Sequence, residues 1–292
     1  MKAIAIGLLV FCGGGVFAQP SSKEQVPLYR VTVIGRTAKA INYQHRNGPT
    51  NIDFRGTVLM PDVRGEARVE SRQGAVQIDA KWERLEPPTR FGHEFLTYVL
   101  WAITPEGRAV NLGEVVPGHN NKARLKTASE LQTFGLIITA EPYYSVTRPS
   151  DVVVLENVVR PDTAGKVEAI EARYELLQRG TYTFDPQAAA ASAGGKKVSL
   201  DEYEALLELY QARNAVQIAR SIGADRYAAE TYRKAEQLLQ QAEEQQRGKA
   251  GHKTVVMTAR QAAQTAEDAR LIATRRQDEE REKARPLAGL NQ

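Results

Sequence analysis

The C-terminal third of the chain places alanine, rather than leucine, at the helix positions that its heptad spacing marks as buried. The clearest stretch reads "GADRYAAETYRKAEQLLQQAEEQQRG", from Gly223 to Gly248. A leucine seam holds neighbouring helices apart, whereas alanine lets two helix backbones approach closely and keeps helix propensity high. Alanine also buries less apolar area per residue. This pattern predicts a slim antiparallel bundle with little room for a ligand pocket between its helices.

Three helices are predicted from steps of four and three residues between small or apolar side chains. The first begins at Ser199, and Glu202 three residues later gives the spacing of a capping box. Gly223 separates the first helix from the second, and "RGKAGHK" separates the second from the third. We expect an alanine-rich hairpin or three-helix bundle over residues 199–284, followed by a tail at 285–292. The predicted packing seam consists of Ala205, Leu209, Ala212, Val216, Ala219, Ala228, Ala235, Leu238, Ala242, Val255, Ala259, Ala262, Ala266, Ala269 and Ala273.

The region before the helices has a different pattern. Residues 26–184 carry short alternating runs, such as "LYRVTVIGR" and "ARVESRQGAVQIDAKW", separated by proline and glycine. The run "EFLTYVLWAIT" is more uniformly apolar, which is typical of a strand buried on both sides. About seven to nine short strands with no long helical pattern between them predict an antiparallel β-sandwich of the immunoglobulin-like type, with a barrel as the alternative.

A compositional break joins the two regions. The segment "DPQAAAASAGGKK", residues 185–197, has no periodicity and no apolar residue larger than alanine, so it predicts a linker. The fold class expected from the whole sequence is therefore α+β with two domains, a β-sandwich over residues 26–184 and a helical bundle over residues 199–284.

The N-terminus, "MKAIAIGLLVFCGGGVFAQP", has the features of a secretory signal peptide over residues 1–18. Lys2 supplies the positive charge, an apolar stretch follows, and cleavage is expected after Ala18. One alternative is a retained membrane anchor, although the apolar run is shorter than the roughly 20 residues that span a bilayer. Another is lipid attachment at Cys12, where Phe11 stands in place of the usual small residue. We expect an exported protein in the periplasm or at the periplasmic face of the outer membrane.

Cleavage would also remove the only cysteine, Cys12. The mature chain would then have no disulfide, no thiolate metal ligand and no cysteine nucleophile. The full sequence has 39 basic and 35 acidic residues, and loss of Lys2 changes the net charge from +4 to +3. A charge so close to balance does not predict nucleic-acid binding. No apolar stretch after Ala18 is long enough to cross a membrane, so we expect no transmembrane segment in the mature chain.

Two segments resemble known bacterial families. The sequences "ARNAVQIARSIGADRYAAETYRKAEQLLQQAEE" and "TARQAAQTAEDARLIA" resemble an alanine-rich envelope helical-hairpin domain of unknown function (DUF 4398 type). This likeness covers about residues 199–282 and implies an exported helical hairpin without assigned enzymatic residues. The segment "YVLWAITPEGRAVNLGEV", residues 98–115, is similar to the periplasmic β-domain of anti-sigma-K factors. That likeness implies a fold rather than an activity.

No catalytic, cofactor-binding or metal-binding residues are predicted. The four histidines, His45, His93, His119 and His252, do not lie within metal-ligand spacing of one another. No GxSxG or SxxK motif stands in a strand–turn–helix context. Acidic and basic residues are frequent in the helices, where we interpret them as solvated salt-bridge partners. The sequence therefore predicts a protein that is not an enzyme and needs no cofactor.

A contact surface is predicted in the β region. "HNNKARLKTA" places Lys122, Arg124 and Lys126 on one face of a predicted strand, where they would meet an anionic polymer or simply protect an edge strand from pairing. "EPYYSVTRPSD" adds Tyr143 and Tyr144, of which at least one should face the core because alternate residues of a strand point in opposite directions.

Three functions remain open from the sequence. The favoured one is a non-enzymatic cell-envelope protein whose β-sandwich contacts a partner protein or a cell-wall or outer-membrane component. Its helices would then act as a spacer, a docking element or a homo-oligomerisation element. The second is a carbohydrate or small-ligand binding module anchored by the helices, which requires an exposed stacking platform among Trp82, Trp101 and the tyrosines. The third, an envelope-stress sensing component, follows from the likeness to anti-sigma factors.

Overall fold

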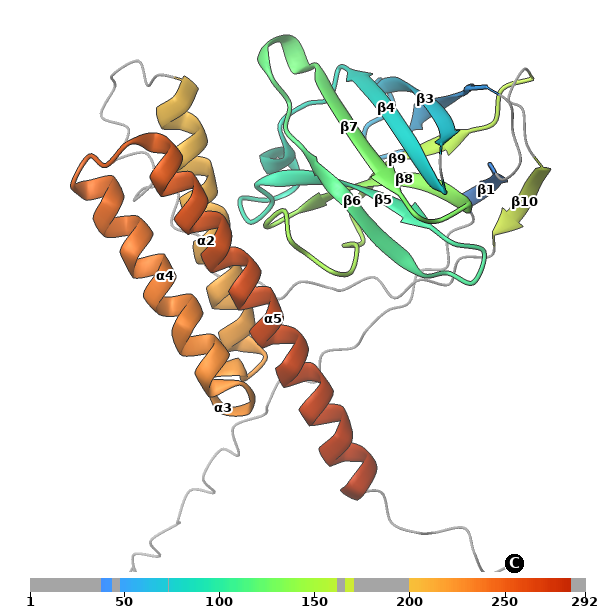
Figure 1. The fold of residues 1–292 in the computed structure, drawn as a ribbon. Helices are drawn as coiled ribbons and strands as arrows, with labels where there is room; N and C mark the ends of the chain where they lie inside the picture. Colours follow the sequence, from blue (N-terminus) through green and yellow to red (C-terminus); the bar gives the residue numbers. More distant parts are fainter. Residues whose placement is uncertain (1–37, 44–47, 73, 162–165, 171–199, 285–292) are drawn as a thin grey trace, which may run out of the picture. The chain divides into compact units, whose positions relative to one another are not determined.

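The structure, a computed structural model, describes residues 38–43, 48–72, 74–161, 166–170 and 200–284. An antiparallel sheet is followed by helices (Figure 1), which confirms the predicted α+β class. The predicted signal peptide, the linker at 185–197, the tail at 285–292, the run "LYRVTVIGR" and the cap residue Ser199 lie outside the described residues. None of the helices in the described ranges combines the length and the apolar character needed to cross a bilayer.

The β region contains ten described strands and two short 3-10 turns. The strands are β1 (Ala38–Asn42), β2 (Thr50–Gly56), β3 (Arg64–Arg72), β4 (Ala75–Glu83), β5 (Thr97–Ile103), β6 (Ala109–Val115), β7 (Ala123–Ser129), β8 (Thr133–Glu141), β9 (Val153–Val158) and β10 (Lys166–Ile170). The turns are η1 (Pro88–Phe91) and η2 (His119–Asn121).

One continuous hydrogen-bonded path, in the order β10-β1-β8-β9-β2-β3-β4-β7, connects most of the strands. The strand β8 is the branch point, because it pairs with β5 on one edge and with β9 and β1 on the other. β6 then pairs with β5 and approaches β7, where the Thr127 hydroxyl donates a hydrogen bond to the Leu112 carbonyl (2.7 Å). Because this path curls toward closure, the sheet is nearly barrel-like rather than clearly a sandwich.

The inner face of the sheet is a filled apolar core. β4 alternates strictly, with every second side chain buried. Trp82 lies inside at the end of this alternation, and its ring centroid is 5.5 Å from that of Phe54. Gly65 is its cross-strand partner, and a Cβ at this position would lie 2.3 Å from the Trp82 ring. Glycine is therefore required here because the tryptophan ring occupies the space of a side chain.

The strand β5 is buried along its whole length, as its uniformly apolar sequence predicts. Its alternate residues belong to two different apolar clusters. Tyr98 and Leu100 pack with the inner face of the sheet, whereas Val99 and Trp101 pack with residues of the helices. The helices therefore cover the outer face of this part of the sheet.

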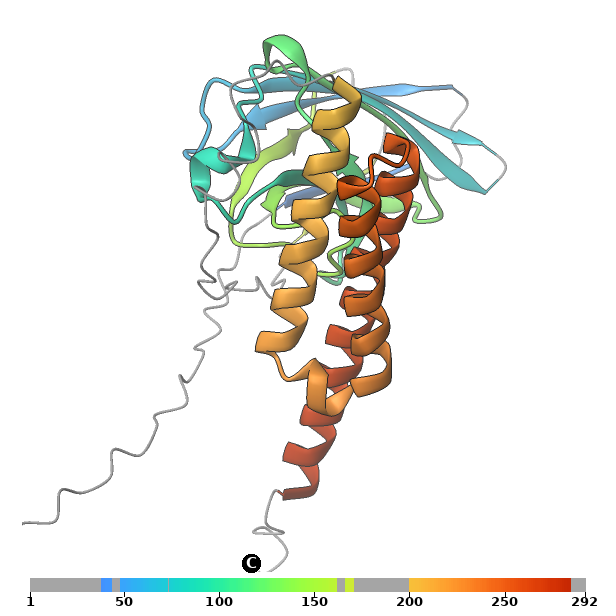
Figure 2. The same cartoon turned by 90° about the vertical axis from the view of Figure 1, so that its left-hand side faces the viewer.

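The helical bundle contains α2 (Leu200–Ser221), α3 (Ala224–Tyr227), α4 (Ala229–Arg247) and α5 (His252–Ala284), which lie side by side (Figures 1 and 2). α2 and α5 run in the same direction. His252 Nε2 lies 3.6 Å from Asp201 Oδ2 near the start of both helices, and Gln277 donates to the Ile222 carbonyl (2.5 Å) just past the end of α2. Gly223 has a φ of 82°, the left-handed conformation that ends α2 and turns the chain toward α4.

The structure places the predicted seam residues inside the bundle. All of them are buried except Leu238, which is partly buried against the same cluster. α2 and α5 are buried over wide arcs, since each contacts both the other helices and the β region. Within α4, only Tyr232, Ala235 and Ala242 are buried.

Candidate functional site

Both tryptophans of the β region are buried in its core. Trp82 is 1% exposed and Trp101 is 0% exposed. The Trp101 indole N–H donates to the Thr139 hydroxyl (2.8 Å), so the polar atom of this side chain is also satisfied internally. Functional contacts must therefore be sought on the outer surface of the sheet, which differs strongly between the side that the helices cover and the side that they leave free.

On the covered side, a buried ion pair of α5 is bonded to the loop between β8 and β9. Glu267 accepts two hydrogen bonds of 2.7 Å from the guanidinium of Arg270. Tyr143 donates its hydroxyl to the same carboxylate (2.6 Å). Thr147 donates both its hydroxyl (2.6 Å) and its backbone N–H (3.0 Å). Burial raises the pKa of Glu267, but the hydrogen bonds from these partners outweigh burial and lower the pKa to about 2.

A second cluster on the covered side places two carboxyl groups, those of Glu114 and Glu208, beside the single guanidinium of Arg260. Glu114 of β6 accepts hydrogen bonds from Thr97 (2.8 Å), Gln211 (2.7 Å) and Arg260. Arg260 Nη2 also lies 3.2 Å from Glu208 Oε1, so one guanidinium serves two carboxylates. Burial, followed by the proximity of Glu114, raises the pKa of Glu208 to about 8. The carboxyl group of Glu208 is therefore mostly protonated at neutral pH.

The tyrosines of the predicted contact surface lie on this covered side. Tyr143 is fully buried, and Tyr144 is partly buried with its hydroxyl donating to the Arg260 carbonyl (3.0 Å). Their contacts are with the helices of the chain itself. The prediction that charged helix residues are solvated is wrong for Glu208, Glu267 and Arg270, which are all buried. The missed signal is spacing: these residues share a helix face with apolar neighbours.

On the free side, the outer face of β3, β4 and β7 is dense in charge. The strand register aligns Arg68, Asp79 and Lys126 in one row across the three strands. Seven basic and four acidic residues project outward here, and their net charge is +3. We call this set of residues the charged face. The charged face consists of Arg64, Glu66, Arg68, Glu70, Arg72, Asp79, Lys81, Glu83, Lys122, Arg124 and Lys126.

The three predicted basic residues lie together on this face, at and just before β7, which ends the hydrogen-bonded path of the sheet. Lys122 pairs with Glu83 (3.0 Å). Arg124 donates two hydrogen bonds to Asp79 (2.9 and 2.6 Å), and Lys126 lies 3.5 Å from the same carboxylate. The hydrogen bond from Arg124 lowers the pKa of Asp79. Two carboxylates thus face three cations, all of which are accessible to solvent.

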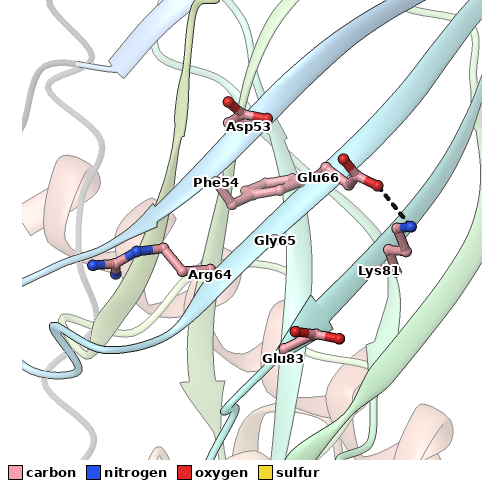
Figure 3. A pocket seen from close by; sticks show the side chains of 7 residues that line it. All are labelled: Asp53, Phe54, Arg64, Gly65, Glu66, Lys81 and Glu83. Carbon is pink, nitrogen blue, oxygen red and sulfur yellow. Dashed lines mark ion pairs between the residues drawn. The ribbon is translucent and has the colours of Figure 1, made fainter.

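A hollow of about 460 Å³ lies at one end of the charged face (Figure 3). Its wall includes the ion pair between Lys81 and Glu66 (2.6 Å), and Asp53 and Glu83 stand on either side. Arg64 turns away from the hollow and donates to the carbonyls of the preceding loop. The other two carboxylates of the hollow also have cationic partners, since Lys122 lies 3.0 Å from Glu83 and Arg160 lies 3.4 Å from Asp53.

Metal binding finds no support in the described part of the chain, where no group of three histidine, cysteine or acidic side chains lies close enough to hold an ion. His93 is exposed and His252 faces Asp201. His45 and the side chain of His119 lie outside the described residues. In comparisons with known proteins, no family model matches the chain and no curated protein sequence matches it.

Proposed function

We propose that the protein is a non-enzymatic component of the cell envelope, in which the charged face contacts an envelope component or a partner protein. The observation that carries the proposal is the division of the outer surface of the sheet. The helices cover the outer face at β5 and β8, while the face at β3, β4 and β7 stays exposed and charged. A buried apolar core and an exposed, charged sheet favour contact with a macromolecule over binding of a small substrate.

In this proposal the bundle is a spacer and docking element of fixed geometry. Gln211 and Asn214 of α2 bond to Glu114, Glu94 and Pro142 of the β region, and Glu267 of α5 bonds to Tyr143. Such contacts hold the bundle against the sheet over several turns of helix. Homo-oligomerisation through the helices is the weaker form of the proposal, because α4 is largely polar on its outer side.

The export of the protein rests on its N-terminal sequence and the predicted cleavage after Ala18. Three finer points stay predictions. They are the immunoglobulin-like sandwich, the likeness of the helices to the envelope hairpin family, and the likeness of the β region to anti-sigma-K factors. A role in envelope-stress sensing depends on the last of these alone.

The alternative of a carbohydrate or small-ligand binding module has less support. Such modules stack sugars on exposed aromatic rings, whereas Trp82 and Trp101 are both buried. Among the tyrosines that the sequence singled out, Tyr143 is also buried.

The test is retention of envelope material by the purified mature protein. We expect the parent chain to retain a defined cell-wall, outer-membrane or protein component from solubilised envelope fractions. The triple variant Lys122→Glu, Arg124→Glu, Lys126→Glu should lose it. The control is Arg233→Glu, Lys234→Glu, Arg247→Glu, which makes the same charge change at exposed positions of α4. Retention of no component by the parent chain would refute the proposal.

A further inference from the structure

The three basic residues of the charged face next to β6 form a straight, accessible array. Lys122, Arg124 and Lys126 alternate along one strand, so their Cα atoms repeat at about 6.6–6.8 Å. Their side chains are 63%, 62% and 68% exposed. We call these three residues the basic strip. The outer face of the strip carries no carboxylate of its own strand, which distinguishes it from β3 and β4, where both signs of charge are interspersed.

The strip is neutralised from one side only. Its carboxylate partners, Asp79 and Glu83, both belong to β4. On the other side, β6 has a single charged residue, Glu114, which is bonded to Arg260 and Gln211 on the covered side. The side of the strip next to β6 therefore has cationic donors with no acid opposite them.

We propose that the basic strip binds a linear anionic polymer that carries one phosphate or carboxylate group per repeat. This inference rests on the proposed function and names the class of partner that the charged face takes. An extended chain lying along β7 brings successive anions to successive cations, and Arg124 can hold a phosphate or carboxylate with two parallel hydrogen bonds.

The ion pairs that the strip already makes with Asp79 and Glu83 can be exchanged for ion pairs with such a polymer. All of them are exposed, and exposed pairs contribute little because water and salt screen them. An incoming anion leaves Asp79 and Glu83 in water, so no charge becomes buried without a partner. Release of counterions from the polymer then favours the complex and makes it sensitive to salt.

A neighbouring hollow extends the anion site toward β3. It has a volume of about 660 Å³, and its lining has three basic residues, Arg68, Arg72 and Lys126, against two acidic ones, Asp79 and Glu70, of which Glu70 pairs with Arg72 (3.0 Å). Arg68 stands opposite Asp79, which Arg124 and Lys126 already occupy. A polymer branch or substituent entering this hollow would meet Arg68 and the Gln77 amide as further donors.

The geometry favours a polymer over an anionic bilayer. A bilayer presents a plane of phosphates to the whole charged face and meets its four carboxylates as well as its seven cations. A single extended chain can follow the strip, whose own strand carries no carboxylate, and lie away from the carboxylates of β3. A flat membrane surface therefore gains less from this arrangement of charges than a chain does.

The test measures binding of two fluorescently labelled polymers to the mature protein at low salt, poly(glycerol phosphate) and polygalacturonate. The first polymer carries phosphodiester groups and the second carries carboxylates, so the two measurements show which anion the strip binds. We expect at least one to bind, with affinity falling about tenfold or more between low and physiological salt. The triple variant Lys122→Glu, Arg124→Glu, Lys126→Glu should bind at least about tenfold more weakly, and the triple variant on α4 should bind like the parent.

A gain-of-binding variant makes the test sharper. Asp79→Asn with Glu83→Gln removes the carboxylates that hold the strip and should tighten polymer binding severalfold, an effect that a merely structural role of β7 would not produce. Binding to vesicles of phosphatidylglycerol is measured in parallel and tests whether the protein binds an anionic bilayer instead. The inference is overturned if neither polymer binds, if reversal of the strip leaves binding unchanged, or if only vesicles bind. Retention of an envelope partner without polymer binding would leave the proposed function standing and refute this inference alone.

Discussion

The covered and free sides of the sheet use the same residue types for different purposes. Arg270 and Glu267 form a pair that is 4% and 0% exposed, and every oxygen of the carboxylate has several partners. Arg124 and Asp79 form a pair that is 62% and 36% exposed, with a third charge, Lys126, close to the carboxylate. Burial makes loss of either member of the first pair costly to stability, whereas exposure to solvent makes the second pair exchangeable. An arginine–carboxylate pair thus stabilises the fold on the covered side, whereas on the free side it is available to contact a partner.

The largest effect is expected from breaking the buried pair. Glu267→Ala leaves Arg270 buried without its carboxylate and removes the acceptor of Tyr143 and Thr147, which should lower the free energy of unfolding by about 3–5 kcal/mol. Urea denaturation followed by circular dichroism measures this change. The double variant Glu267→Met, Arg270→Met should recover much of the loss because it leaves no unpaired charge. A loss below about 1 kcal/mol for Glu267→Ala would show that this contact does not hold the bundle to the sheet.

The second cluster should make stability depend on pH in the opposite direction from an ordinary paired acid. The pKa of Glu208 is raised from 4.5 to about 8, so the folded protein binds a proton that the unfolded chain has lost. Its contribution to stability is fully present below about pH 4.5 and is lost as the pH rises through about 8. The expected decrease is about 2–4 kcal/mol over this interval, after allowance for coupling to Glu114.

Glu208→Gln checks this assignment, because glutamine keeps the shape of the side chain and cannot ionise. Urea midpoints measured across neutral and mildly alkaline pH should fall with pH in the parent and stay nearly level in the variant. Glu267, with its pKa of about 2, contributes stability that is lost only in acid, as the pH falls from about 4.5 through 2. An equal slope in the parent and in Glu208→Gln would contradict the assignment.

The alanine seam should tolerate larger side chains poorly. Ala266 is fully buried in the cluster that joins the bundle to the covered side of the sheet. Ala266→Leu forces the helices apart and should cost about 1–3 kcal/mol of unfolding free energy. Gln264→Leu adds the same side chain at an exposed position of α5 and serves as the control. Equal urea midpoints for the two variants would contradict close packing at Ala266.

The division into strands and then helices was predictable from the sequence, because side-chain periodicity reports local geometry directly. The alternation of β4 and the heptad steps of α5 are examples. The closure of the sheet was not predictable, since it depends on β8 pairing with β1 and β5, which are distant in sequence, as well as with β9. Sequence periodicity gives the inward face of each strand but says little about which edges meet.

The candidate site divides in the same way. Lys122, Arg124 and Lys126 could be placed on one face because alternation suffices to do so. The roles of Tyr143, Glu208 and Glu267 could not be predicted, because each depends on contacts between the helices and a β region that is distant from them in sequence. A hint was present in α2, where Gln211 and Asn214 interrupt a helix that is otherwise buried over a wide arc. Polar residues at such positions indicate a second packing partner.

The smallest effect on folding is expected on the free side. Asp79→Asn removes the carboxylate shared by Arg124 and Lys126, yet all three side chains are accessible to water, which replaces the lost bonds. The urea midpoint should match that of the parent within experimental error, although Asp79 pairs with both Arg124 and Lys126. A clear loss of stability would mean that the charged face supports the fold in the way that Glu267 does. The contrast between the two sides of the sheet would then fail, and with it the reason for regarding β7 as a surface free to bind.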